Sequence, residues 1–572
     1  MIDLKQAFKD KTGKIFAILI IVIFLGFMLR LLGIRFGLPD STYVDSGHTI
    51  MPAKKIAYSI LQGNFDIDPG TYLYPALFYN ILATEFVVYG VIYGIFADGE
   101  NFSQKMHFLF QDESNNHRFH LLARMTSAVA GTLTILFVFL LGTYAYHNDK
   151  RIGLIASTFL AFMYLHVKDS KYPMTDATMC LFTTIALIYI AKTILEGQKK
   201  DFILSGLFIG LATSVKWLPG TLLLPFTIAI IVRFLNERKR NILSRQFYMK
   251  LFLGFFFIFI GFVMGTPQFV PKFTDYTGRF IKTGQSHFVT KSELSEGKKG
   301  KLGQVQQGYF DLIFSTTPNW NEPLSLNSLR GAMDLPLLIL TLIGLFYALY
   351  KGLVLRSKEG GVDIAFVAFI LAYYFMEARP GGIRVVRYFF LILPLFCVIA
   401  SRFLVEAIDY ITYPQKIKNI LMVISVLFFV APTGARAFRY SYLQSHTDTR
   451  THAIRWMHDN IPHGSRILMP GLYHPKIKYE NYKVFFYSKS MVEKCILSLA
   501  LLRENNVDYV VTSSYLSDRY FHEETLREYR HVVVCFKEFI DSLERHGKLF
   551  KEFKSNLWDQ PGPTIKIYQL QY

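Results

Sequence analysis

The sequence predicts a mainly α-helical protein, a polytopic membrane bundle of about eleven spans with interfacial helices, followed by a small α/β domain outside the cytoplasm. Three observations predict this fold. Only 18% of the 572 residues are charged and 52% are hydrophobic, whereas a soluble chain carries about 25% charged residues. The apolar residues gather in runs of roughly 16 to 24, which is the length that a hydrocarbon core of about 30 Å requires. After about residue 450 the composition becomes that of a soluble domain.

Eleven apolar runs are long enough to cross the membrane as helices. The first follows Lys5, Lys9, Lys11 and Lys14 and has no small-residue cleavage site after it, which predicts a retained anchor and a cytoplasmic N-terminus. The predicted spans are 15–34, 121–146, 152–167, 177–195, 202–216, 217–235, 249–270, 334–352, 363–378, 386–408 and 417–434.

A twelfth apolar run, 73–96, is also long enough to cross, since it would be about 36 Å long as a helix. If it does not cross, basic loops such as the one with Arg238, Lys239 and Arg240 all face the cytoplasm; if it crosses, they face outward, against the positive-inside rule. The run also holds Glu85, and an ionised group at mid-membrane costs at least about 3 kcal/mol. We therefore predict an interfacial or re-entrant helix.

This topology places the long polar segments outside and the short basic loops inside. The predicted domains are a membrane domain, 1–435, with outer loops 35–120 and 271–333, and an extracytoplasmic α/β domain, 436–572. The smaller outer segments are 168–176 and 379–385. Basic loops that face the cytoplasm and anionic lipid account for the net charge of +19. The sequence contains no nucleic-acid-binding motif such as a zinc finger. We expect membrane lipids, and not nucleic acid, as partners.

The tail alternates helices and strands, which is typical of a small α/β domain. Helices are predicted in THAIRWMHDNIPHG, MVEKCILSLALLRENN and HVVVCFKEFIDSLERHG, and strands in SRILMPG, VDYVVTS and PTIKIYQL. The absence of a Gly-rich phosphate loop favours packing or acceptor docking over catalysis. Cys495 and Cys535 could pair if this region is extracytoplasmic, but we expect two free thiols; no cysteine has metal-ligand spacing.

Acidic residues stand at the outer ends of two spans, where acids could act as a base and its orienting partner. The first group, after the first span, is Asp40, Asp45 and His48, and the second group, after the third span, is His166, Asp169, Lys171 and Asp176. His287 in the outer loop 271–333 is a further accessory candidate.

Cations are expected on the same face. Lys216 ends one helix, and the short loop before another carries Arg379, Arg384, Arg387 and Tyr388. Arginines in an outer loop require an anionic partner, and lipid headgroups or a carboxylate such as that of Glu377 are the structural alternatives. A bound phosphate is the functional alternative for this anionic partner, because guanidinium binds phosphate with paired hydrogen bonds. Acids and cations at the outer interface suit sugar transfer from a lipid phosphate, which needs a base and cations but no general acid.

The order of these segments resembles the glycosyltransferase C superfamily, and within it the protein O-mannosyltransferases and the aminoarabinose transferase of lipid A (glycosyltransferase family 39). The matching pieces are VDSGH, YPALFY, ARMTSAVAGTLTILFVFLLG, HVKDSKYPMTDATMCLF, SGLFIGLATSVKWLPG, RVVRYFFLILP and THAIRWMHDNIPHGSRIL. The resemblance implies a membrane enzyme that passes a sugar from a polyprenyl-phosphate donor to a protein, lipid or glycan acceptor outside the cytoplasm, with inversion. It also implies that Asp45 is the base, with Asp176 as a second acid and Lys216, Arg384, Arg387 and Tyr388 at the donor phosphate.

One feature departs from the family pattern. Many members have Asp-Glu in the first loop, where this chain has Asp45-Ser46, and Asp40 or Asp169 would have to compensate in any mechanism that needs the second carboxylate. No cofactor is assigned. A divalent metal remains open, since the carboxylates could hold one but no His-x-x-x-His spacing is present.

Other function classes remain as alternatives. A transporter or lipid flippase usually keeps ionisable residues at mid-membrane and shows repeated halves, whereas these spans carry charges mostly at their ends. A scaffold would leave the outer charges unexplained, and an oligosaccharyltransferase is disfavoured by the lack of a WWD-type motif in the tail. We expect a prokaryotic plasma membrane, with the membrane of the endoplasmic reticulum as the alternative.

Overall fold

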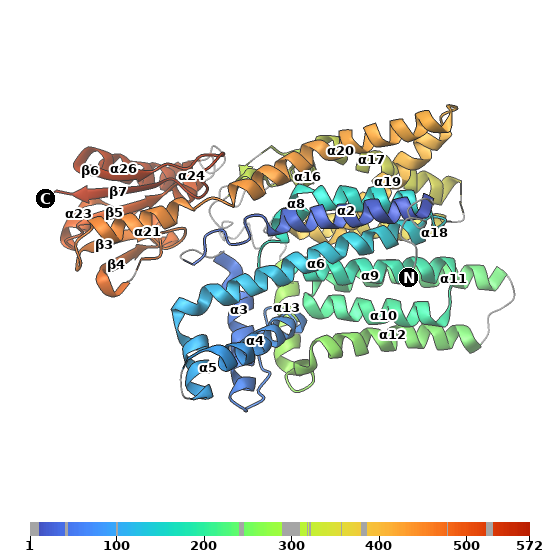
Figure 1. Ribbon diagram of the computed structural model, residues 1–572, viewed down its shortest axis with the longest axis horizontal. Coiled ribbons are helices and arrows are strands. Elements are labelled where there is room, and N and C mark those ends of the chain that lie inside the picture. Colours follow the sequence, from blue (N-terminus) through green and yellow to red (C-terminus); the bar gives the residue numbers. More distant parts are fainter. Residues whose placement is uncertain are drawn as a thin grey trace.

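The helices of the bundle follow the apolar runs of the sequence. Figure 1 shows the computed structural model, in which a bundle of long helices lies beside a C-terminal domain built on a sheet. The structure describes residues 11–39, 44–98, 101–239, 245–288, 309–316, 318–319, 322–355, 357, 359–378, 386–477, 479–521 and 530–571. The predicted fold class, a mainly helical membrane protein with a C-terminal α/β domain, is confirmed.

Each of the eleven predicted spans falls on a helix of the described chain. These helices are α2 (Lys11–Leu31), α6 (Asn116–Ala145), α7 (Lys150–Phe162), α9 (Asp176–Leu195), α10 (Lys199–Val215), α11 (Leu223–Lys239), α12 (Arg245–Gly265), α17 (Leu335–Leu349), α18 (Gly360–Glu377), α19 (Leu393–Tyr410) and α20 (Gln415–Leu443). All except α7 and α10 are long and apolar enough to cross a membrane, α11 and α17 only together with the short helical turns that adjoin them. The short α7 is followed, after Met163, by α8 (Tyr164–Asp169).

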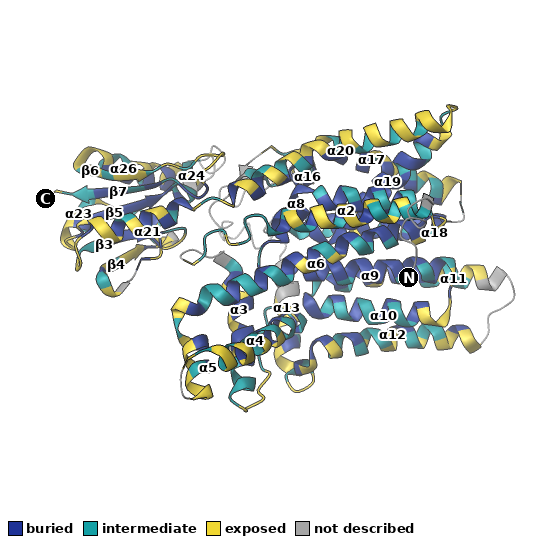
Figure 2. Cartoon of the chain, viewed as in Figure 1, coloured by how far each residue is buried: buried dark blue, intermediate teal, exposed yellow. Residues whose placement is uncertain are grey.

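Burial separates central from peripheral helices. In α9, 78% of the most apolar window is buried inside the protein, against 11% in α20 and 17% in α12. Figure 2 shows the same contrast, with exposed residues frequent along α20 and α12. The large apolar side chains exposed there include Phe256 and Phe428. Exposed apolar surface on this scale is what a lipid environment requires of the outer helices.

Helices α10 and α12 pack closely because glycines line their contact. A Cβ atom added at Gly206 or Gly210 would overlap the backbone of α12, and one added at Gly261 would overlap the Leu207 carbonyl of α10. Small residues of this kind let transmembrane helices approach each other without a side chain between them. This contact holds α10, and therefore the residue that follows it, in a fixed position.

The first outer segment forms α3 (Gly47–Leu61), α4 (Leu77–Phe96) and α5 (Phe102–Gln111), which gather at the end of the bundle nearer the C-terminal domain (Figure 1). Helix α4 packs mainly on α3. The carboxylate of Glu85 accepts a hydrogen bond from Thr126 Oγ1 of α6 at 2.5 Å. Because α4 is also apolar and long enough to cross, its interfacial placement stays a prediction. The third outer segment contains α13 (Phe273–Phe288), α15 (Tyr309–Phe314), β1 (Pro318–Asn319), β2 (Glu322–Leu326) and α16 (Leu329–Met333).

The C-terminal domain is a five-stranded mixed sheet with the strand order β4-β3-β5-β7-β6. The strands are β3 (Arg466–Pro470), β4 (Lys483–Tyr487), β5 (Tyr509–Ser513), β6 (Gly547–Phe553) and β7 (Ile565–Leu570). Strands β3, β4 and β5 are parallel, whereas β7 runs antiparallel to β5 and β6. Alternate residues of β5 enter two apolar clusters, Val510 with α26 (Arg530–His546) and Val511 with α21 (Thr449–Asn460). This alternation is the two-residue period of a strand buried on both faces.

Two expectations for the tail are wrong in detail. The predicted helix MVEKCILSLALLRENN is broken into α22 (Lys489–Glu493) and α23 (Leu499–Glu504), because Cys495 between them has a positive φ of 54°. Cys495 and Cys535 are not free thiols but form a disulfide, with their Cα atoms 5.5 Å apart. The break after α22 turns Cys495 toward α26, which carries Cys535. Helix α20 also continues past residue 435 to Leu443 before the domain begins.

Candidate active site

Two acid–cation pairs bring together four of the predicted site residues. Asp45 lies in a single turn, η1 (Val44–Ser46), and its Oδ2 is 3.1 Å from Arg387 Nη1 in η6 (Val386–Ile392). Asp176 is the first residue of α9, and its Oδ1 is 2.9 Å from Lys216 Nζ at the end of α10. An acid at a helix N-terminus is stabilised by the helix dipole. Residues 342 positions apart in sequence therefore meet in one pair.

Tyr388 connects the two pairs. Its ring centroid lies 5.6 Å from Lys216 Nζ and 5.9 Å from Arg387 Cζ. The backbone carbonyl of Tyr388 accepts a hydrogen bond from Tyr373 Oη of α18 at 2.7 Å, which fixes the turn that carries it. Cations over an aromatic face are attracted by the negative charge of the ring. Asp45, Asp176, Lys216, Arg387 and Tyr388 thus form one cluster, called here the acid–cation cluster.

Sequence reasoning missed Tyr74 as a member of this cluster. Its ring centroid is 5.7 Å from Lys216 Nζ. Burial raises the pKa of Tyr74 above its ordinary value, so the phenol keeps its proton and can donate a hydrogen bond. The segment is anchored to the end of α12, since Ala76 N donates to Thr266 Oγ1 at 3.0 Å and Asn80 Nδ2 donates to the Gly265 carbonyl at 3.0 Å. Tyr74 belongs to the YPALFY segment, whose apolar residues indicate contact with the membrane and do not by themselves predict a polar site.

The two pairs differ in burial. The side chains of Asp176 and Lys216 are 4% and 11% exposed, whereas those of Asp45 and Arg387 are 38% and 23% exposed. A buried pair can be broken only at a large cost, while a partly exposed pair can exchange partners. The geometry therefore suits Lys216 and Asp176 for a fixed charge arrangement, and Asp45 and Arg387 for contact with a bound molecule.

The other predicted residues of the second outer segment contact different parts of the chain. His166 is buried, with Nδ1 2.6 Å from Arg30 Nη2 and its ring stacked on Phe390 at 4.7 Å. Asp169 Oδ1 is 3.3 Å from the ammonium of its neighbour Lys168. Lys171 Nζ donates to the Leu32 carbonyl and to Ser441 Oγ, both at 2.6 Å. Among the described residues, these contacts join α2, α20 and η6 rather than Asp45 or Asp176.

Lys171 belongs to a set of cationic contacts that hold the chain leaving α2. Arg124 Nη1 donates to the carbonyls of Ile34 and Phe36 at 2.7 and 2.8 Å, and Lys171 binds the carbonyl of Leu32. Carbonyls at the end of a helix lack intrahelical partners, and cations satisfy them well. These contacts fix the backbone that leads toward Asp45, a role that the sequence did not predict for Arg124.

The remaining predicted residues are not placed in the cluster. His48 is exposed on α3. His287 lies near the end of α13, but its side chain is outside the described part of the structure, as are Asp40, Arg379 and Arg384 entirely.

Within the part of the chain that the structure describes, the acid–cation cluster offers a divalent metal too few free oxygen ligands. Asp45 and Asp176 each pair with a cation, whereas Mg²⁺ and Ca²⁺ need several free oxygen ligands. The group of possible ligands that the described residues do bring within 4.8 Å of one another is Cys495, His531 and Cys535. Its two thiols are consumed by the disulfide.

One family model matches part of the chain. Residues 94–277, from the end of α4 into α13, match the family described as Dolichyl-phosphate-mannose-protein mannosyltransferase. The matched stretch contains Asp176 and Lys216. A search of the curated proteins finds no match.

Solved structures share the fold over most of the chain. The Archaeoglobus fulgidus oligosaccharyltransferase tethered to an acceptor peptide is 13% identical, with a TM-score of 0.52, covering 92% of this chain and 72% of its own. The oligosaccharyltransferase AglB from the same archaeon, in complex with an inhibitory peptide and a dolichol-phosphate, is 13% identical, with a TM-score of 0.51, covering 94% of this chain and 73% of its own. ArnT from Cupriavidus metallidurans bound to undecaprenyl phosphate is 12% identical and covers 98% of both chains, with a TM-score of 0.43. At these identities, the two archaeal matches with TM-scores above 0.5 show the fold alone.

The family match over residues 94–277 agrees with the resemblance seen in that part of the sequence. The family match covers about a third of the chain, and the archaeal structures show that the whole chain has the fold of a polytopic helical bundle with a C-terminal domain.

Proposed function

We propose that the chain transfers a sugar from a polyprenyl phosphate to a hydroxyl group of a protein, lipid or glycan acceptor outside the cytoplasm, with inversion at the anomeric carbon. The observation that carries the proposal is the partly exposed Asp45–Arg387 pair beside the buried Asp176–Lys216 pair. The cluster thus holds one reachable carboxylate and two cations around a single tyrosine, Tyr388.

In this mechanism the donor phosphate competes with Asp45 for the guanidinium of Arg387. Guanidinium binds phosphate oxygens in pairs, and Lys216 adds a second positive charge nearby. Asp45 then has its carboxylate free to accept a proton. Breaking the bond between the anomeric carbon and the phosphate oxygen leaves negative charge on the phosphate, which both cations stabilise in a partly dehydrated site.

Asp45 acts as the general base. The acceptor oxygen attacks the anomeric carbon from the face opposite the phosphate, and its proton passes to Asp45 as the new carbon–oxygen bond forms. The polyprenyl phosphate leaves with the electron pair of the broken bond, and Asp45 returns its proton to water. Asp176 does not touch the substrate in this proposal but holds Lys216 at 2.9 Å in a position to meet the phosphate.

The proposed orientation places the cluster and the C-terminal domain outside the cytoplasm, with the N-terminus inside, in a prokaryotic plasma membrane. Two observations support it. The loops between the spans at the opposite end of the bundle are rich in Lys and Arg. The tail contains the Cys495–Cys535 disulfide, and disulfides persist in oxidising compartments.

The test combines transfer and donor binding in purified enzyme. With a radiolabelled polyprenyl-phosphate sugar and a hydroxyl acceptor, Asp45→Asn should reduce transfer by about 10²- to 10⁴-fold, as expected for loss of a general base. The same variant should still bind polyprenyl phosphate, whereas Arg387→Ala should weaken that binding. Asp98→Asn, an exposed aspartate of the same outer segment, is the matched control. Full transfer by Asp45→Asn would refute the assignment of the base.

A further inference from the structure

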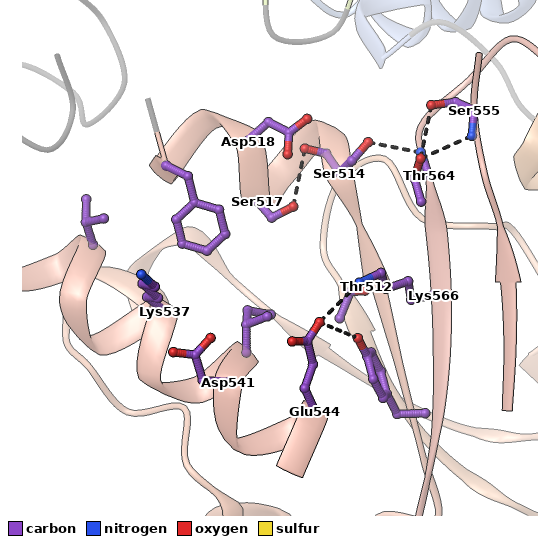
Figure 3. A pocket seen from close by; sticks show the side chains of 14 residues that line it. Thr512, Ser514, Ser517, Asp518, Lys537, Asp541, Glu544, Ser555, Thr564 and Lys566 are labelled. Carbon is purple, nitrogen blue, oxygen red and sulfur yellow. Dashed lines mark hydrogen bonds and ion pairs between the residues drawn. The ribbon is translucent and has the colours of Figure 1, made fainter. Parts of the chain in front are cut away.

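A cavity lies in the C-terminal domain, lined by none of the residues of the acid–cation cluster. It has a volume of about 610 Å³ and lies between α24 (Ser514–Phe521), α26 and the strands β5 and β7 (Figure 3). Small-molecule sites usually have volumes of about 300–1,000 Å³. The sequence predicted no function for any residue that lines it.

An unpartnered hydroxyl lines the strand side of this cavity. Thr512 of β5 is 8% exposed, and within the described residues its hydroxyl has no hydrogen-bond partner. The neighbouring hydroxyls are engaged, since Ser514 Oγ accepts from Thr564 N at 2.9 Å and Ser517 Oγ donates to the Ser513 carbonyl at 3.4 Å. The Thr512 hydroxyl is not among the fully buried polar atoms that lack a partner, so a molecule in the cavity can reach it and accept or donate a hydrogen bond.

Charged side chains from both helices line the same cavity (Figure 3). Asp518 comes from α24 and Asp541 from α26, whereas Glu544 of α26 is already paired with Lys566 at 3.1 Å. Burial raises the pKa of Asp518 above its ordinary value. Lys537 is the other cation on the wall. The carboxylates of Asp518 and Asp541 form no ion pair among the described residues, and carboxylate oxygens accept hydrogen bonds from the hydroxyl groups of a ligand.

The apolar part of the wall is aromatic. Phe521 lines the cavity, and its ring is held by Phe536 at a centroid distance of 5.8 Å. Tyr568 lines it as well, with its hydroxyl 3.4 Å from Glu544 Oε1. An apolar ring beside several acceptors matches a sugar, which has one apolar face and hydroxyl groups around its edge. Phosphates and nucleotides do not fit, because three carboxylates outnumber two ammonium groups on the wall.

We propose that this cavity, called here the tail pocket, binds a neutral saccharide. Thr512 and Asp541 hydrogen-bond to its hydroxyl groups, and Phe521 packs against its apolar face. The choice of a saccharide over another polyol rests on the proposed sugar transfer, because a sugar-bearing acceptor or product would then be the natural occupant of an outer domain.

The test measures saturation-transfer difference NMR on the detergent-purified full-length chain with the methyl glycosides of mannose, glucose and N-acetylglucosamine. At least one glycoside should show transfer at millimolar concentration. Thr512→Val, which removes the hydroxyl and keeps the shape, and Asp541→Asn should each weaken the binding about tenfold or more. Glu538→Gln, on the exposed face of α26 and outside the tail pocket, is the matched control and should bind normally.

The outcomes separate this proposal from the catalytic one. Asp45→Asn should keep glycoside binding in the tail while losing sugar transfer, so either proposal can fail without the other. Melting temperatures check that Thr512→Val remains folded, and Asp541→Asn provides a second variant at a less buried position. The proposal is overturned if none of the three glycosides binds, or if binding is unchanged in both Thr512→Val and Asp541→Asn.

Discussion

Removing one member of the buried Asp176–Lys216 pair should destabilise the protein strongly. At the observed separation of 2.9 Å, their attraction is about 6 kcal/mol for an effective dielectric constant of about 20. Most of this attraction offsets the cost of burying two charges, whose side chains are 4% and 11% exposed. Asp176→Ala leaves the Lys216 ammonium buried without its partner and is expected to cost about 3–5 kcal/mol.

A double variant separates the contribution of the ion pair to stability from the contribution of each side chain alone. Asp176→Leu combined with Lys216→Met removes both charges, so stability should return close to that of the natural chain, while donor binding should stay weak because Lys216 is lost. The four proteins of the cycle are the natural chain, Asp176→Leu, Lys216→Met and the double variant. Denaturant titration of each in detergent gives the coupling free energy between the two side chains. If the two single variants each cost under about 1 kcal/mol, or if their effects simply add in the double variant, the buried-pair reasoning is refuted.

Three further predictions concern packing, the disulfide and pH. Replacing Cys495 and Cys535 by Ser removes a bridge that spans 40 residues and should destabilise the tail domain by about 4 kcal/mol; an unchanged denaturation midpoint with and without reductant would contradict this. Gly206→Leu places a side chain against the backbone of α12 and should lower the melting temperature and yield, whereas Gly278→Leu, which meets open space, should not. Burial lowers the pKa of His474 to about 4, so only the unfolded tail binds a proton between pH 6.5 and 4. The free energy of unfolding of the tail should therefore fall by up to about 3 kcal/mol as the pH drops through that window. Hydrogen exchange measures this pH dependence, and His474→Gln should make it weaker.

The membrane part of the fold was predictable because hydrocarbon imposes a length on every span. The eleven runs fall on helices for that reason, and even the 13-residue α7 is completed by the turns of α8. In the tail, β4 and β6 were missed. Their burial is irregular, since only Tyr487 of β4 is buried and β6 is an edge strand, so the two-residue period is absent from the sequence.

The candidate site was predictable in composition but not in pairing. Ion pairs across 40 and 342 residues depend on how helices pack, and no local pattern encodes that. The sequence grouped His166 and Lys171 with Asp176 because they are close along the chain. In the folded protein a helical turn directs them to Arg30 and to the end of α2 instead. Tyr74 was missed for the opposite reason, since it reaches Lys216 from a distant segment.

Helix α20 connects the bundle to the tail domain in a way that sets the rotation of that domain. Its 29 residues make a rod of about 43 Å, longer than a hydrocarbon core of about 30 Å, and its last turns lead into the tail domain. Arg439 on those turns donates to the Leu557 carbonyl at 3.4 Å and lies 4.4 Å from the Trp558 ring. One residue inserted before Arg439 would turn that contact by about 100° around the rod. Exchange of tail domains between relatives should therefore succeed only where the helical phase at this junction is kept.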